Sequence, residues 1–360
     1  MNTITIKNIT HRTPKNVLKN MLFSFAMPIA LFSASSFSYD YSCGDSETSC
    51  VKNFNKEATN TNTTETVNIV RVTLAGKDTP SIGEIKGNVN QLNNFYDTAS
   101  RDQFHLKLGT AKTVEVTSQN CSKAKNQAME QISSNAFITV FSMPKGICDS
   151  SNAGQHKIFM NDGLFRTYAH EAGHIMGLGH GNRIDANGNF DAYGDASTYM
   201  GSVPSDNYNI PQLHWLGWTK KEEVVKINDP IDNGGSIEVE LRPVDRNPAS
   251  DSDIPLAYVY EIPNTDTRLF IAIPKSRESN VNRIDGGEIF VYRAPKCNGC
   301  RGISMGTTHI ERIGPKSNKD HEVSGLIINP IRYESEKISF EGRKIDKFKS
   351  ITLRISKAPN

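Results

Sequence analysis

Residues 170–180 read HEAGHIMGLGH, and this run decides the fold that we expect. Residues four apart lie on one face of a helix, so His170 and His174 can direct ring nitrogens at a single ion. Gly177 lacks a Cβ and can take a positive φ, which would end the helix and bring His180 back as a third ligand. Three protein ligands that leave a fourth position open are typical of catalytic zinc. The run therefore predicts zinc held by His170, His174 and His180.

Glu171 follows the first ligand, about 100° around the helix, so we expect it beside the metal rather than on it. There its carboxylate can act as general base and then as general acid in hydrolysis. Incidental histidines on a polar helix face are the alternative. The chain has only 9 His and 26 Gly in 360 residues, so the further matches at Gly177 and His180 favour zinc. No Cys lies near the run to complete a closed structural site.

Residues 1–38 have the pattern of a secretory signal peptide. A basic region precedes the apolar run 21–34, and small residues at Ser36 and Ser38 suit cleavage after Ser38. An uncleaved membrane anchor is the alternative, but the apolar run is short for a membrane span. The chain has 41 basic and 39 acidic residues, and removing the four basic residues of this segment leaves 37 against 39. This near-neutral balance gives no support for nucleic acid or a membrane surface as partner.

Six cysteines follow the signal segment, an even number that suggests disulfides in an exported chain. Proximity in sequence favours the pairs Cys43–Cys50, Cys121–Cys148 and Cys297–Cys300. The last pair flanks Asn-Gly and could instead be a redox or metal-binding C-x-x-C.

The chain divides by composition into four segments, of which the third carries the zinc run. After the signal, residues 39–66 read as a polar N-terminal segment and linker, 67–220 as a small sheet with helices, and 221–360 as β-rich. In 67–220 we expect strands at 67–76, 105–108, 113–117 and 137–141 and helices at 82–96, 122–133 and 163–176. In the last segment we expect no helix and strands at 224–227, 236–241, 257–262, 269–273, 288–292, 337–340 and 350–355. Such a series is typical of a β-sandwich. The fold class is α+β.

The zinc run, followed by Met200 in the turn Ser197-Thr198-Tyr199-Met200-Gly201, resembles the metzincin clan of zinc proteases. The stretch Tyr193–Gly201 (YGDASTYMG), with Leu216-Gly217-Trp218 downstream, looks like the gametolysin-type peptidase family, M11. The resemblance covers about residues 67–220. It implies an endopeptidase acting on extracellular proteins or glycoproteins, with Met200 packed beneath the histidines. Residues 221–360 carry no motif of this family.

Two further features of the clan concern other metal contacts. Some members have a Tyr two residues after the Met that can bind zinc or the oxyanion, but this chain has Ser202 there. Tyr199 precedes the Met and is expected to pack, so zinc itself would stabilise the oxyanion. Cys43-Gly44-Asp45 resembles the cysteine switch of some precursors, although a disulfide with Cys50 is the competing interpretation.

A second cation is suggested by oxygen side chains at alternate positions, Asp185, Asn187, Asn189 and Asp191, with Asp195 after them. Such a loop can bind Ca²⁺, but an Asn/Gly-rich surface loop has the same composition. His214 is expected to pack rather than to bind metal.

These patterns together predict a secreted zinc-dependent endopeptidase with Glu171 as the catalytic residue. Its partner would be a protein or glycoprotein substrate, with neither nucleic acid nor a stable membrane anchor involved. A secreted adhesin or glycan- or protein-binding module that retains a metzincin scaffold is the alternative.

Overall fold

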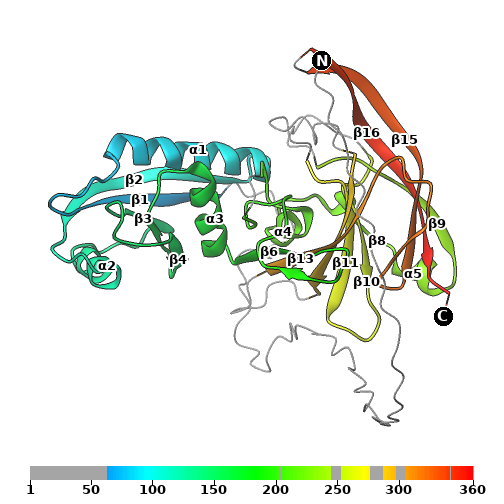
Figure 1. The fold of residues 1–360 in the computed structure, drawn as a ribbon, viewed down its shortest axis with the longest axis horizontal. Coiled ribbons are helices and arrows are strands. Elements are labelled where there is room, and N and C mark those ends of the chain that lie inside the picture. Colours follow the sequence, from blue (N-terminus) through cyan, green and yellow to red (C-terminus); the bar gives the residue numbers. More distant parts are fainter. Residues whose placement is uncertain are drawn as a thin grey trace, which may run out of the picture. The chain divides into compact units, whose positions relative to one another are not determined.

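The computed structural model describes residues 63–202, 205–244, 253–275, 287–296, 305–340 and 342–359. All of them belong to one compact unit, Tyr41–Asn360. The predicted signal segment, most of the polar linker, and the predicted disulfides Cys43–Cys50 and Cys297–Cys300 lie outside the described residues. The fold is a mixture of helices and several sheets, as expected for an α+β protein (Figure 1).

A five-stranded sheet, in the order β2-β1-β3-β5-β4, forms the first part of the fold. All neighbours in it are parallel except the edge strand β4, which is antiparallel to β5. The strands are β1 (Thr63–Thr73), β2 (Phe104–Glu115), β3 (Ile138–Ser142), β4 (Asn152–Gly154) and β5 (Lys157–Met160). Three helices accompany this sheet, namely α1 (Ile82–Ser100), α2 (Cys121–Glu130) and α3 (Phe165–Ile175).

Helix α1 begins and ends where its sequence specifies. The Ser81 side chain accepts from the Glu84 backbone while the Glu84 side chain accepts from the Ser81 backbone, a complete capping box. Arg101 closes the helix in the left-handed conformation, with φ of 57°. Between these ends the apolar residues recur every three or four positions and bury one face of the helix.

The two faces of the five-stranded sheet are covered by different helices. One face packs with α1 and α3 in a large apolar core that includes Val67, Ile69 and Val140. The other face packs with α2 in a smaller core that includes Val72 and Phe141. Because side chains alternate across a strand, Val67 and Ile69 share one face. Helix α3, which carries His170 and His174, lies against this face.

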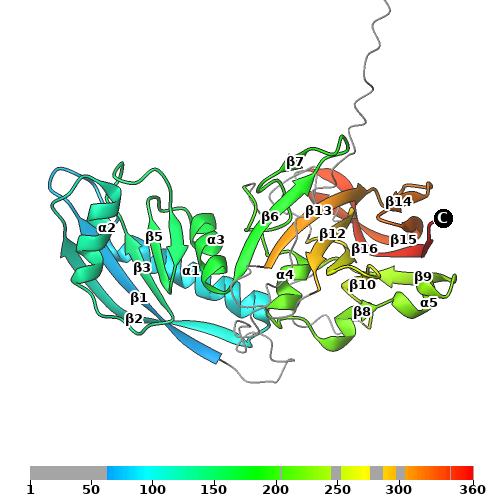
Figure 2. The ribbon, with the colours of Figure 1, turned by 90° about the horizontal axis from the view of Figure 1, so that it is seen from below.

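A seven-stranded sheet, in the order β7-β6-β13-β12-β11-β10-β8, follows. Strand β6, which lies next to the edge strand β7, is parallel to β13 (Figure 2). The strands are β6 (Leu178–Ile184), β7 (Phe190–Asp191), β8 (Val224–Lys226), β10 (Ala257–Glu261), β11 (Thr267–Ala272), β12 (Ile289–Pro295) and β13 (Met305–Ile313). Helix α4 (Ile210–Trp215) packs in the same apolar core as α1 and α3. The boundary expected at residue 220 therefore separates strands that share this sheet.

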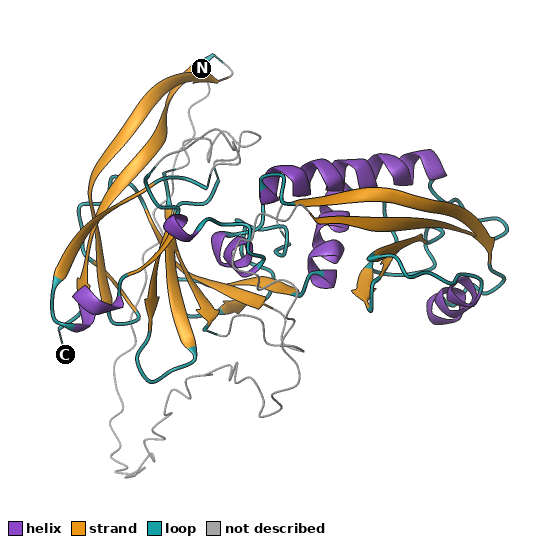
Figure 3. Cartoon of the chain, turned by 180° about the vertical axis from the view of Figure 1, so that it is seen from behind, coloured by secondary structure: helices purple, strands orange, loops and turns teal. Residues whose placement is uncertain are grey.

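A four-stranded sheet, in the order β14-β15-β16-β9, completes the described fold (Figure 3). Its strands are β9 (Ser236–Leu241), β14 (His321–Val323), β15 (Leu326–Phe340) and β16 (Arg343–Lys357). Apolar side chains of this sheet, such as Leu353, share a core with those of the seven-stranded sheet, such as Ile271. Among the described residues, no helix has both the length and the apolarity required to cross a membrane.

Several sequence expectations are confirmed and others are corrected. Cys121 and Cys148 form the predicted disulfide. The strands expected at 105–108 and 113–117 are one strand, β2, because its pairing with β1 continues past Gly109 through a register shift. The expectation of no helix after Trp218 is wrong, since a 3-10 turn η1 (Lys221–Glu223) and a short helix α5 (Asn228–Asp232) are present.

Candidate metal centre

Helix α3 carries the first two histidines of the run and ends at Ile175, and Gly177 makes the predicted turn just beyond it. Gly177 has a φ of +84°, a conformation that side chains with a Cβ rarely adopt. A Cβ at this position would also stand 2.7 Å from Cη2 of Trp215. Both facts require glycine, and the turn that it makes leads directly into strand β6 at Leu178.

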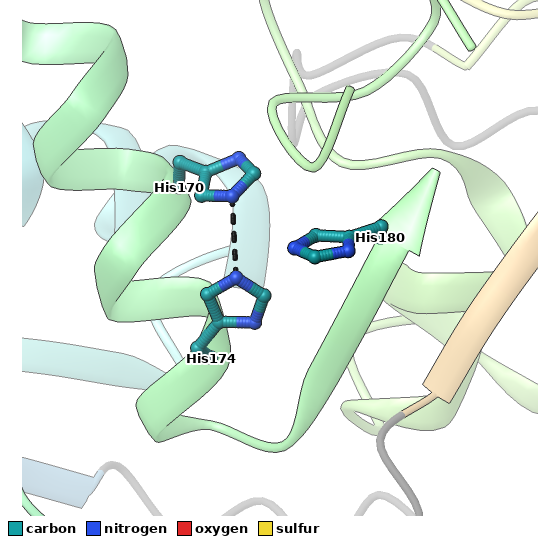
Figure 4. Close-up of side chains that lie close together, drawn as sticks. All are labelled: His170, His174 and His180. Atoms are coloured by element: carbon teal, nitrogen blue, oxygen red, sulfur yellow. Dashed lines mark hydrogen bonds between the residues drawn. The ribbon is translucent and has the colours of Figure 1, made fainter. Parts of the chain in front are cut away.

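The rings of His170 and His174 leave helix α3 on the same side, and that of His180 approaches them from strand β6 (Figure 4). The Nε2 atoms of His170 and His174 are 3.2 Å apart. One nitrogen from each of the three rings can be chosen so that all lie within 4.8 Å of one another. Within the described ranges, this is the one cluster of three or more His, Cys, Asp or Glu side chains suited to a metal ion.

Backbone carbonyls fix the orientation of the two helical rings. Nδ1 of His170 lies 2.8 Å from the carbonyl oxygen of Tyr199, and Nδ1 of His174 lies 2.8 Å from that of Leu178. A carbonyl can only accept, so each Nδ1 carries the proton and each Nε2 presents a lone pair.

Two lone pairs that face each other repel unless a cation lies between them, so this arrangement suits a metal ion. Two nitrogens bound to one tetrahedral zinc would stand about 3.3 Å apart, close to the 3.2 Å between His170 and His174. Nitrogen donors of this type and number fit zinc.

The three imidazoles are kept neutral by their surroundings. Burial lowers the pKa of His170 and of His174, and burial together with the neighbouring His174 and His170 lowers the pKa of His180 to about 4. A neutral imidazole is the form that binds a metal. The site is therefore ready to take a cation at neutral pH.

Met200 lies beneath the helix, where the family resemblance led us to expect it. It is fully buried, and a Cβ added to Gly173 would overlap its sulfur. Gly173 stands between the two helical histidines in sequence, so the close approach of Met200 brings the turn 197–201 directly under the ligand pair. The same turn supplies the Tyr199 carbonyl that orients His170.

Glu171 is buried, with 6% of its surface exposed. In the part of the chain that the structure describes, its carboxylate has no hydrogen-bond partner. Burial, together with the negative charge of Asp162, raises the pKa of Glu171 to about 7. A buried carboxylate without a hydrogen bond is costly to maintain, and such groups gather at functional sites.

Tyr193 is a site residue for which no individual role was predicted from the sequence. Its ring centroid lies 4.0 Å from that of His180 and 6.1 Å from that of His170. The sequence signal was its place in the YGDASTYMG stretch, where it served only as part of a resemblance.

A buried polar network connects strand β6 and the Met200 turn with strand β13. Asn209 donates to both Asp195 (2.9 Å) and Thr307 of β13 (2.7 Å). Gln212 accepts from Thr198 (2.6 Å) and donates to the Gly179 carbonyl (3.2 Å), beside His180. The network explains why Asp195 and Gln212 are buried although both are polar.

Other residues singled out in the sequence have contacts of their own. Asp185 accepts hydrogen bonds from Asn187 and Asn189, whereas Asp195 is bound to Ser197 and Asn209. Calcium binding by this loop stays a prediction.

The Ser202 hydroxyl donates to the Tyr193 carbonyl. The ring of Tyr199 packs edge-on against Phe95 and Phe165, as expected for a packing residue. His214 packs against Phe270.

Comparison with known proteins adds little to this geometry. No family model matches the chain, and no curated protein matches it. A solved structure described as "Structure of a chaperone-substrate complex" is similar at 15% identity and a TM-score of 0.27, covering 44% of this chain and 31% of that one. The chain thus spans about a third of that structure's chain, and a likeness this slight informs neither the fold nor the site.

Proposed function

We propose that the protein is a secreted zinc-dependent endopeptidase of the metzincin type. The observation that carries the proposal is the convergence of His170, His174 and His180 on one point, with the buried carboxylate of Glu171 on the same helix. The peptide hydrolysis that we assign needs this combination of a three-nitrogen metal site and a carboxylate base.

Each residue of the centre has a definite task in this reaction. His170 and His174 would hold the metal through Nε2, since both Nδ1 atoms are engaged with carbonyls. Zinc, when bound, would act as a Lewis acid that polarises the scissile carbonyl. Glu171 would take a proton on its carboxylate and return it to the leaving amine.

The edge strand β4 offers a place for an extended peptide. Of the strands that the structure describes, only β5 pairs with β4, so no described strand lies at its other edge. Residues Asn152 and Gly154 are exposed, and β4 also contacts α3, the helix that carries Glu171. A peptide that adds to this edge by main-chain hydrogen bonds would run beside the metal centre, which supports a polypeptide substrate.

Export and the role of the β-rich region are parts of the same proposal. The signal-like segment 1–38 and the Cys121–Cys148 disulfide support an oxidising, extracellular location. The seven- and four-stranded sheets share an apolar core, which supports a β-sandwich-like arrangement of the C-terminal strands. We propose that the substrates are proteins or glycoproteins outside the cell.

Glu171→Gln tests the function because it removes the base and leaves all three histidines in place. We expect the variant to bind zinc like the unaltered protein and to cleave a proteome-derived peptide library at least about 100-fold more slowly. Glu130→Gln is the matched control, since Glu130 is an exposed glutamate at the end of α2. Zinc content by mass spectrometry and cut-site mapping are the measurements.

Two outcomes would contradict the proposal. Undiminished cleavage by Glu171→Gln would remove Glu171 from the mechanism. A protein that holds one equivalent of zinc and cleaves nothing in the library would favour a binding module on the same scaffold.

A further inference from the structure

His180 differs from the other two candidate ligands in how its ring is held. The Nδ1 atoms of His170 and His174 are fixed by carbonyl oxygens. Within the described ranges, neither ring nitrogen of His180 has a protein hydrogen-bond partner. A metal-binding histidine is usually oriented by a hydrogen bond on its second nitrogen, and His180 has no such bond to a described protein group.

The contact that takes this place is the aromatic ring of Tyr193. The two ring centroids are 4.0 Å apart with an interplanar angle of 41°. This is the shortest separation among the ring pairs that involve His170, His174 or His180, the triad of candidate ligands. The same tyrosine ring lies nearly parallel to that of His170, at 6.1 Å and 28°. It therefore borders two of the three imidazoles and limits the rotation of His180.

Tyr193 is held in an unfavourable backbone conformation to make this contact. Its φ is 65°, in the left-handed region that residues with a Cβ rarely adopt. Its carbonyl accepts from the backbone N–H of Ser202 at 2.7 Å and from the Ser202 hydroxyl at 3.1 Å. Its own N–H donates to Oδ1 of Asn182 at 3.3 Å.

The position of Asn182 ties this loop to the ligand itself. Asn182 and His180 are two residues apart on strand β6. The amide of Asn182 binds the Tyr193 backbone, and the Tyr193 ring covers His180. The strained residue and the ligand that it covers are thus held by one short stretch of β6. Strain kept by surrounding contacts is a mark of functional positions.

We propose that Tyr193 is a positioning residue that clamps His180, and that its ring, rather than its hydroxyl, determines how tightly the centre retains its metal. This inference rests on the proposed metal centre. Without the ring, His180 would sample more orientations, and the entropy lost on metal binding would increase.

The test is the zinc affinity and zinc release rate of the full-length protein, measured by competition with a chromophoric chelator. Tyr193→Gly removes the ring and is compatible with a φ of 65°, so the backbone of the loop is not strained by the change. We expect its affinity to fall about 10- to 100-fold, mainly through faster release. Tyr193→Phe keeps the ring and should stay within about threefold of the unaltered protein.

Asn264→Gly is the control for the backbone, because Asn264 has a φ of 58° in the turn between β10 and β11. This substitution relieves a similar strain and should leave zinc affinity unchanged. Imidazole NMR signals of the metal-free protein give a second readout, since His180 should show increased exchange broadening in Tyr193→Gly only.

The outcomes separate this inference from the proposed function. If the unaltered protein binds no zinc, the metal centre fails and the clamp fails with it. If the unaltered protein binds zinc and Tyr193→Gly binds it equally well, only the clamp is overturned. If Tyr193→Phe loses as much affinity as Tyr193→Gly, the hydroxyl is responsible and the assignment to the ring is wrong.

Discussion

His170 and His174 stand on one helix, whereas His180 stands on a strand whose neighbour in the sheet, β13, comes from the C-terminal part of the chain. The helical pair is positioned by local geometry and by two carbonyl oxygens. His180 depends on strand pairing and on the Tyr193 ring. A motif that is continuous in sequence is thus supported in two ways. Helix geometry places His170 and His174, whose rings also meet the carbonyls of Tyr199 and Leu178, whereas long-range strand pairing places His180.

The largest effect on zinc affinity should come from removing a candidate ligand, either on helix α3 or on strand β6. His174→Ala and His180→Ala should each lower zinc affinity by more than about 100-fold, beyond the usual effect of an outer-shell change. Equilibrium competition with a chelator measures this, with His156→Ala as the control because His156 is exposed and outside the triad. An affinity within tenfold for His180→Ala would mean that the helical pair binds the metal alone.

The turn at Gly177 joins helix α3 to strand β6, and a substitution there should have the second-largest effect. Gly177→Ala should lower the free energy of unfolding by about 3 kcal/mol, from positive-φ strain and from displacement of Trp215. Gly188→Ala is a matched control, because Gly188 has a φ of +82° and no atom within 4 Å of an added Cβ. Strain alone should cost it about 1 kcal/mol. Equal losses of stability in chemical denaturation would show that Trp215 yields freely.

The sequence predicted the local side of the site well. Helical spacing and Gly177 placed His170, His174 and the end of α3, and the Cys121–Cys148 disulfide followed from proximity. These features depend on contacts within a few residues or within one loop, which leave a pattern in the sequence.

The features that position His180 left no such pattern in the sequence. β13 reads MGTTHIERI, in which polar residues are frequent, and it was not expected as a strand. Parallel pairing with β6 requires partners from distant parts of the chain, which no local periodicity reports. Tyr193 was likewise missed, because its role depends on a turn that brings it over His180.

Acid should weaken the contact between α4 and the seven-stranded sheet through His214 of α4, whose ring packs against Phe270 of β11. Burial, with the charge of Arg268, lowers the pKa of His214 to about 4 from 6.5. Between these values the unfolded chain binds a proton that the folded protein does not, so stability falls as pH decreases from 6.5 towards 4. The full difference is about 3 kcal/mol and is retained above pH 6.5.

The measurement is chemical denaturation of the metal-free protein at several pH values, with His214→Gln as the comparison. Other buried histidines titrate in both proteins, so the difference between the two curves isolates His214. The unaltered protein should lose more stability between pH 6.5 and pH 4 than the variant does. Parallel curves across this interval would contradict the assignment.

The smallest expected effect concerns the single hydrogen bond between Asn209 and Thr307 of β13. Thr307 of β13 accepts from Asn209, which also donates to Asp195 in the loop that leads to Met200. Thr307→Val keeps the shape of the side chain but leaves one amide hydrogen of Asn209 without its acceptor. A loss of about 1–2 kcal/mol is expected, since the group left unsatisfied is buried.

Thr308→Val is the control for this bond, because Thr308 is the next buried residue of β13 and its side chain leaves the opposite face of the strand. If the network holds the His180 strand, Thr307→Val should also weaken zinc binding by a few-fold, whereas Thr308→Val should not. A stability loss without any change in zinc affinity would show that pairing of β6 with β13 positions His180 by itself. The polar network would then stabilise the fold without contributing to the position of His180.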